Sequence, residues 1–219
     1  MFFEKTVPSL VRSSRNPLVI AVCLFVLLVM LVTLSACSGA GGAEKAVKKF
    51  TNAAMDGNFQ AAFKYTAPSY GDVMKTQIES MGMTEKQYYQ LIGTFLDVKV
   101  KNANQFYKAM KKYAQKELKA QYGSNYKTTA KVIRSEKLTG SDLERFKNEC
   151  ASYMRRNFAV SNPESLIPLS KIKDAYRVEV EASIKGRNGS DSETMTLYCV
   201  KTGGKWKVAL MGDANFSLF

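Results

Sequence analysis

The feature that most constrains this chain is an uncharged, apolar run of 17 residues from Leu18 to Leu34. The residues before it carry Lys5, Arg12 and Arg15 against one acid, Glu4. A basic start followed by an apolar stretch is typical of a secretory signal peptide. The run also reaches the lower length limit for a membrane-spanning helix, so its length alone leaves a retained anchor open. In both cases we expect the folded domain to follow it, outside the cytoplasm.

The tetrapeptide Leu34-Ser35-Ala36-Cys37 closes this run and favours cleavage, because a peptidase cleft needs small residues before the cut. It resembles the lipobox of bacterial lipoprotein signal peptides. The resemblance implies a signal peptide over residues 1–36 and a new N-terminus at Cys37, which carries diacylglycerol with acyl chains such as palmitate. Two acyl chains hold a protein stably on a membrane, whereas one is marginal. We therefore expect a lipoprotein on the extracytoplasmic face of a bacterial cell membrane.

Composition limits the partners of the remaining 183 residues, which suffice for a single domain. Without residues 1–36 the chain keeps a net charge of +11. An exported, lipidated protein rarely meets nucleic acid, so we expect anionic lipid head groups or a phosphate-rich envelope polymer instead. The alternative is that the lysines only keep the domain soluble. The candidate contacts with an anionic surface are Lys45, Lys48, Lys49, Lys108, Lys111 and Lys112.

Hydrophobic periodicity predicts helices first and strands last. Apolar residues recur at helical spacing over 43–56, 59–66, 69–81, 84–98, 105–122 and 141–154. Capping boxes are expected at Thr84 and Ser141. Strand-like alternation occurs over 126–135, 176–184, 194–201 and 205–210, with hairpin turns at Asn188-Gly189 and Gly203-Gly204. We therefore predict an α+β domain over 43–219, with N-terminal helices packed on a C-terminal antiparallel sheet, after a flexible tether over 37–42.

Three segments resemble the nuclear transport factor 2-like superfamily, specifically its bacterial lipoproteins of unknown function. They are Ala46–Phe50, Asp56–Phe59 with the following Ala61-Ala62, and Val200–Val208, which contains Gly-Gly-Lys-Trp. The resemblance implies a cystatin-like α+β fold in which the opening helices lie in the concavity of a curved sheet. It also implies that the helical stretch over about 69–122 is an insertion.

The chemistry of the chain favours binding over catalysis. It has no histidine, which excludes Ser-His and Cys-His nucleophile pairs and histidine metal sites. No catalytic residue, metal site or cofactor is assigned. We expect a non-enzymatic domain that binds an envelope ligand at a mouth between sheet and helices, lined by aromatic and aliphatic side chains. The alternatives are a structural subunit that contacts an unknown protein partner and, third, a small isomerase or dehydratase that uses Asp and Tyr.

Two cysteines remain in the predicted domain, Cys150 on a helix and Cys199 on a strand. Cysteine pairs outside the cytoplasm tend to form disulfides. A bond between them would close a loop of about 50 residues and add roughly 4 kcal/mol to stability in the chain-entropy model. The alternative is that both are small, buried core residues.

Overall fold

The computed structural model describes residues 39–95 and 97–211. The chain divides into two units between Ser38 and Gly39, and the fold below is that of the second unit. It begins with an opening helix over residues 39–55. The later helices and strands are α2 Phe59–Ala62, η1 Phe63–Tyr65, β1 Thr66–Ala67, α3 Tyr70–Ser80, α4 Glu85–Phe95, α5 Ala103–Tyr122, β2 Lys127–Lys137, α6 Gly140–Phe158, η2 Pro163–Ser165, η3 Leu169–Lys171, β3 Ala175–Lys185, β4 Ser190–Thr202 and β5 Lys205–Ala209.

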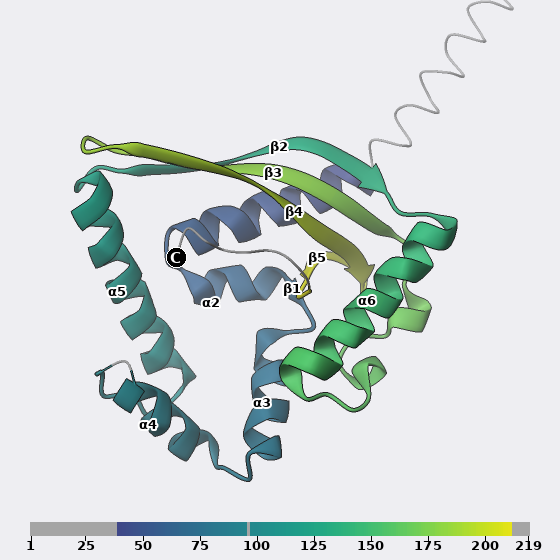
Figure 1. The fold of residues 1–219 in the computed structure, drawn as a ribbon, viewed down its shortest axis with the longest axis horizontal. Coiled ribbons are helices and arrows are strands. Elements are labelled where there is room, and N and C mark those ends of the chain that lie inside the picture. Colours follow the sequence, from purple (N-terminus) through teal and green to yellow (C-terminus); the bar gives the residue numbers. More distant parts are fainter. Residues whose placement is uncertain (1–38, 96, 212–219) are drawn as a thin grey trace, which may run out of the picture. The chain divides into compact units, whose positions relative to one another are not determined.

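The described strands form one sheet in the order β1-β5-β4-β3-β2. The four long strands pair antiparallel, as predicted, but β1 pairs parallel with β5 and makes the sheet mixed. Strand β1 is only two residues long, too short for an alternating pattern to be visible in the sequence. Figure 1 shows β2, β3 and β4 arching over the opening helix, with α3, α4 and α5 on the helix side of the sheet. The predicted α+β class is confirmed.

One face of the sheet packs on the opening helix. The alternate residues Val178, Val180 and Ala182 of β3 are fully buried there, together with Cys199 of β4. Val47 on the opening helix is also fully buried in this cluster. Alternation along a strand puts every second side chain on one face, which is why β3 has one apolar and one polar face.

Helix α6 packs on the opposite face of the sheet, at the end where β3 begins. Its Phe146 ring lies 5.4 Å from the ring of Tyr198 on β4. Cys150 and Met154 are fully buried in the same cluster as Val200 of β4. The domain therefore has two apolar cores, one on each side of the sheet.

The opening helix starts earlier than predicted. Residues 39–42, which the sequence assigned to a flexible tether, are helical. A Cβ atom on Gly42 would overlap the indole of Trp206, and one on Gly39 would lie 2.7 Å from the hydroxyl oxygen of Tyr176. Glycine is thus needed here because the helix backbone lies directly against two aromatic side chains.

Two local predictions were right and two were wrong. The Thr84 capping box is present: its N–H donates to Gln87 Oε1 at 2.8 Å, and Gln87 N–H donates back to Thr84 Oγ1 at 3.3 Å. The Gly203-Gly204 turn has the positive φ angles of a two-residue hairpin. Helix α6 begins at Gly140, so Ser141 does not cap it. Neither Asn188 nor Gly189 has the positive φ expected of them, because the β3–β4 loop spans the four residues 186–189.

Candidate functional site

Helix α5 carries the basic face predicted from the sequence. Its first turn is capped by Asn102, whose Oδ1 accepts the N–H of Gln105 at 3.0 Å, and Gly123 ends it with φ 91°. Leu118 and Tyr122 are buried on the side that faces the domain. Since 3.6 residues make one turn, the lysines at intervals of three and four lie together along one side, which borders the buried side: Lys111 is two turns from Leu118 and three turns from Tyr122.

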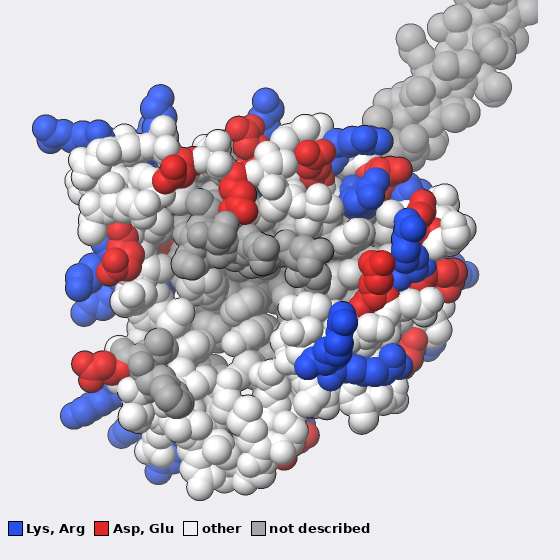
Figure 2. Space-filling view, viewed as in Figure 1, with Lys and Arg blue, Asp and Glu red and all other residues white. Residues whose placement is uncertain are grey.

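This side forms a hollow of about 460 Å³ that is lined entirely by α5. The lining residues are Lys108, Lys111, Lys112, Gln115, Lys116 and Lys119. We call its five lysines the lysine stripe. Figure 2 shows basic side chains, with acidic ones beside them, on the edge that α5 forms in Figure 1. Among the described residues, no ion pair includes a lysine of the stripe, and Glu117 is the one acid of the helix. Within the described part of the chain, the stripe therefore presents positive charge that no acidic side chain pairs with.

Helix α5 is held in position by contacts near its middle and at its C-terminal end. A Cβ on Gly57, which follows the opening helix, would lie 2.6 Å from the Cβ of Ala114. Tyr122 donates its hydroxyl proton to Asp191 at 2.6 Å, and its carbonyl accepts the N–H of Asn188 at 3.3 Å. Burial, with a smaller contribution from Asp191, raises the pKa of Tyr122 to about 12. The stripe is therefore held at the C-terminal end of the opening helix and beside the β3–β4 loop.

The other candidate lysines lie elsewhere. Lys45, Lys48 and Lys49 are exposed on the opening helix and do not line the hollow on α5. Lys49 Nζ lies 5.6 Å from the ring centroid of Tyr65, within range of a cation–π interaction. The six predicted contacts therefore belong to two separate surfaces. Lys116 and Lys119, which the sequence also places on the basic face of this helix but which are not among the six predicted contacts, line the hollow as well.

An aromatic cluster joins η1, α3, α4 and α5. The rings of Phe63 and Tyr70 stack with centroids 3.9 Å apart, and Tyr107 of α5 lies 6.1 Å and 6.2 Å from them. Tyr89 of α4 continues the cluster to Phe106 at 5.8 Å. Burial is the main cause that raises the pKa of Tyr89 and of Tyr107 to about 12. These rings hold α3 and α4 to α5, and so support the helix that carries the lysine stripe.

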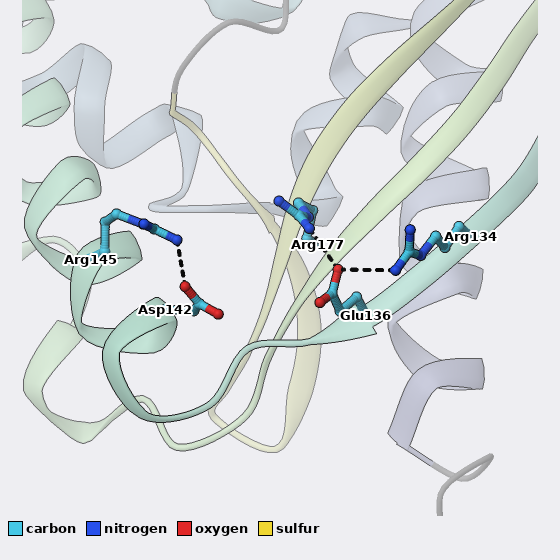
Figure 3. Close-up of polar contacts among 5 residues, drawn as sticks. All are labelled: Arg134, Glu136, Asp142, Arg145 and Arg177. Carbon is cyan, nitrogen blue, oxygen red and sulfur yellow. Dashed lines mark hydrogen bonds and ion pairs between the residues drawn. The ribbon is translucent and has the colours of Figure 1, made fainter.

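A second charged cluster lies on the outer face of the sheet, beside α6 (Figure 3). Glu136 of β2 accepts a hydrogen bond from Arg177 of β3 at 2.6 Å and lies 3.8 Å from Arg134. The hydrogen bond from Arg177 lowers the pKa of Glu136. Arg145 donates to Asp142 within the first turns of α6. Opposite charges are paired within this cluster, which makes it a weaker site for a charged ligand than the lysine stripe.

The predicted disulfide is absent: the structure holds Cys150 and Cys199 as free, buried thiols. Cys199 lies in the core against the opening helix, whereas Cys150 lies in the core under α6 with Val200. Neighbouring residues of a strand point to opposite faces, so the sheet separates the two sulfur atoms. The prediction failed because the apolar stripe of α6 does not say which face of the sheet it covers.

We expect both thiols to be unreactive in the folded protein and free after unfolding. Both are fully buried, and burial raises each pKa to about 12, so the reactive thiolate is scarce at neutral pH. Alkylation with iodoacetamide followed by intact-mass measurement checks this on the wild-type chain and on Cys150→Ser. Denaturation without reductant should let Cys150 and Cys199 both react, and the variant should lose one label. Labels on these residues that appear only after reduction would contradict the structure.

The lipobox residues Leu34, Ser35 and Ala36 and the predicted lipid attachment residue Cys37 lie outside the described residues. Within the described ranges, no helix is both long enough and apolar enough to cross a membrane. The same part of the chain contains no group of three or more acidic or cysteine side chains placed to hold a metal ion.

Comparison with known proteins identifies one similarity. Residues 35–132 match the model of a domain of unknown function, DUF4878, which covers the opening helix through the first part of β2 and includes the whole of α5. No curated protein and no solved structure matches the chain. The matched region thus contains the lysine stripe and leaves out α6 and strands β3 to β5.

Proposed function

We propose that this chain is a lipid-anchored, extracytoplasmic bacterial protein that binds a phosphate-rich polymer of the cell envelope through the lysine stripe, without catalysis. The basic start, the apolar run and Leu34-Ser35-Ala36-Cys37 support the anchor. The stripe supports the ligand class, because lysines without acidic partners attract polyanions. The order of elements, with helices before a sheet that arches over the opening helix, supports a nuclear transport factor 2-like domain.

The geometry favours an envelope polymer over lipid head groups as the ligand of α5. The opening helix is about 25 Å long at 1.5 Å per residue. Its N-terminal end follows the anchor, whereas α5 crosses near Gly57 at its C-terminal end. Membrane charge is screened over about 8 Å at physiological salt, so the stripe lies beyond the reach of the head groups when the anchored domain stands with its opening helix upright on the membrane.

The observation that carries the proposal is that, among the described residues, no ion pair includes a lysine of the stripe. Replacing three of these lysines tests the proposal. We expect Lys111→Gln, Lys112→Gln and Lys116→Gln together to weaken binding of long-chain polyphosphate on the order of tenfold or more, and to flatten its salt dependence. Binding is measured on the acylated full chain in neutral phosphatidylcholine nanodiscs, over a series of salt concentrations.

The matched control removes the same charge from three exposed lysines on other elements, Lys86→Gln, Lys131→Gln and Lys171→Gln. This variant should keep most of the affinity and the slope. Equal losses in the two triple variants would mean that net charge alone attracts the polymer. That result, or a wild-type chain that does not bind polyphosphate, would overturn the proposed function of α5.

A further inference from the structure

The end of the domain at Gly39, which follows the proposed anchor, has a surface formed by well-packed residues. The first described residue, Gly39, is already helical, and two residues of chain from Cys37 to Gly39 can span at most about 7 Å. At this end the backbone of Gly42 lies against the indole of Trp206, and the ring of Trp206 meets that of Tyr176 edge-on at 5.4 Å. The first turn of the opening helix is thus fixed to β3 and β5, which leaves little freedom between a lipid on Cys37 and the domain.

Basic side chains surround this end. Lys45 follows Gly42 by three residues on the opening helix, so the two positions lie on neighbouring turns of one side. Lys201 pairs with Trp206 across β4 and β5, and both residues lie on the sheet face that covers the opening helix. The exposed basic residues at this end are Lys45, Lys137, Lys173, Lys201 and Lys205. They outnumber the neighbouring acids Glu44, Glu136 and Asp174, of which Asp174 pairs with Lys137 at 3.1 Å and Glu136 pairs with Arg177 at 2.6 Å.

We propose that this end, formed by the first turn of the opening helix, Trp206, Lys45 and Lys201, rests on the anionic lipid surface and holds the domain in one orientation. The proposal depends on the proposed anchor at Cys37. The short connection keeps the lysines within the screening length of the head groups. Tryptophan is favoured at the membrane–water interface, which suits the half-buried Trp206.

The orientation directs the lysine stripe away from the bilayer. Strand β3 runs from Tyr176, at the membrane end, to the loop at Gly186, about 30 Å away at the usual rise per residue. Tyr122 at the C-terminal end of α5 lies against that loop. The domain would therefore use one basic surface to stand on the membrane and present another to a polymer beyond it.

The chain contains a single tryptophan, so Trp206 reports the distance of this end from the membrane. The acylated full chain is placed in vesicles that carry dansyl-labelled head groups, and energy transfer from Trp206 is measured. A second form has twelve Gly/Ser residues inserted between Ser38 and Gly39, a tether with a root-mean-square reach of about 19 Å. We expect strong transfer for the wild-type chain in both neutral phosphatidylcholine and anionic phosphatidylglycerol vesicles.

The form with the insertion distinguishes proximity that is due to the short tether from proximity that is due to the basic surface. It should lose transfer in neutral vesicles and regain it in anionic vesicles. Lys45→Gln with Lys201→Gln should abolish this recovery, whereas the matched pair Lys111→Gln with Lys112→Gln on α5 should leave it unchanged. Transfer that does not depend on lipid charge in the inserted form, or equal losses from both pairs, would overturn the inference.

Vesicle flotation distinguishes a failure of this inference from a failure of the proposed anchor. A chain that does not float with vesicles lacks the anchor, and the proposed function then fails with it. A chain that floats but shows weak transfer is anchored without resting on this surface, and only the further inference fails.

Discussion

Replacing Cys37 with serine is expected to abolish lipid attachment completely. Diacylglycerol is linked through the cysteine sulfur atom, and a serine hydroxyl is not a substitute in that modification. Cells that express the wild-type chain are fed an alkyne analogue of palmitate, and the purified protein is examined for the label. The wild-type band should carry the label, and the Cys37→Ser band should carry none.

Cys23 provides the matched control, because it lies inside the apolar run and should be removed with residues 1–36. The Cys23→Ser variant should take up as much label as the wild-type chain. A label that survives in Cys37→Ser, or one that is lost in Cys23→Ser, would show that the acyl chains are attached elsewhere.

Gly186→Ala is expected to cause the largest loss of stability of any single methyl addition at the β3–β4 loop. A Cβ at this position would overlap the carbonyl oxygen of Tyr122 and lie 2.7 Å from its carbonyl carbon. The loop and the end of α5 must then separate, because a backbone carbonyl cannot rotate away as a flexible side chain can. We expect the free energy of unfolding to fall by about 3 kcal/mol.

Gly189→Ala is the control for this prediction, since a Cβ there would meet no atom within 4 Å. Its effect should stay within about 0.5 kcal/mol of the wild-type value. Urea unfolding of the wild-type chain and the two full-length variants, followed by Trp206 fluorescence, gives the change in the free energy of unfolding for each variant. Equal stability of the two variants would mean that α5 does not end against this loop, and the position inferred for the lysine stripe would be wrong.

Local patterns in the sequence predicted the elements that their own residues determine. The intervals of three and four between the lysines predicted the outer side of α5, and the alternation in β3 predicted its buried and exposed faces. The Thr84 capping box was also predictable, since both partners lie within one turn. Each of these features is encoded in residues close together in the chain.

Features that depend on distant contacts were not predictable in the same way. Glycine-rich residues such as 39–42 favour a flexible chain in isolation, and they are helical here because Trp206 and Tyr176 pack against them. The parallel pairing of β1 with β5 joins residues that are far apart in sequence. The separate positions of Cys150 and Cys199 depend on which face of the sheet α6 covers. The division of the lysines between two surfaces has the same origin, because it follows from the tertiary position of α5.

The intact mass of the protein purified from membranes tests the anchor, on which the rest depends, most directly. We expect a chain that begins at residue 37 and carries the added mass of a diacylglyceryl group on Cys37. A chain that still begins at Met1 and carries no added mass would contradict it.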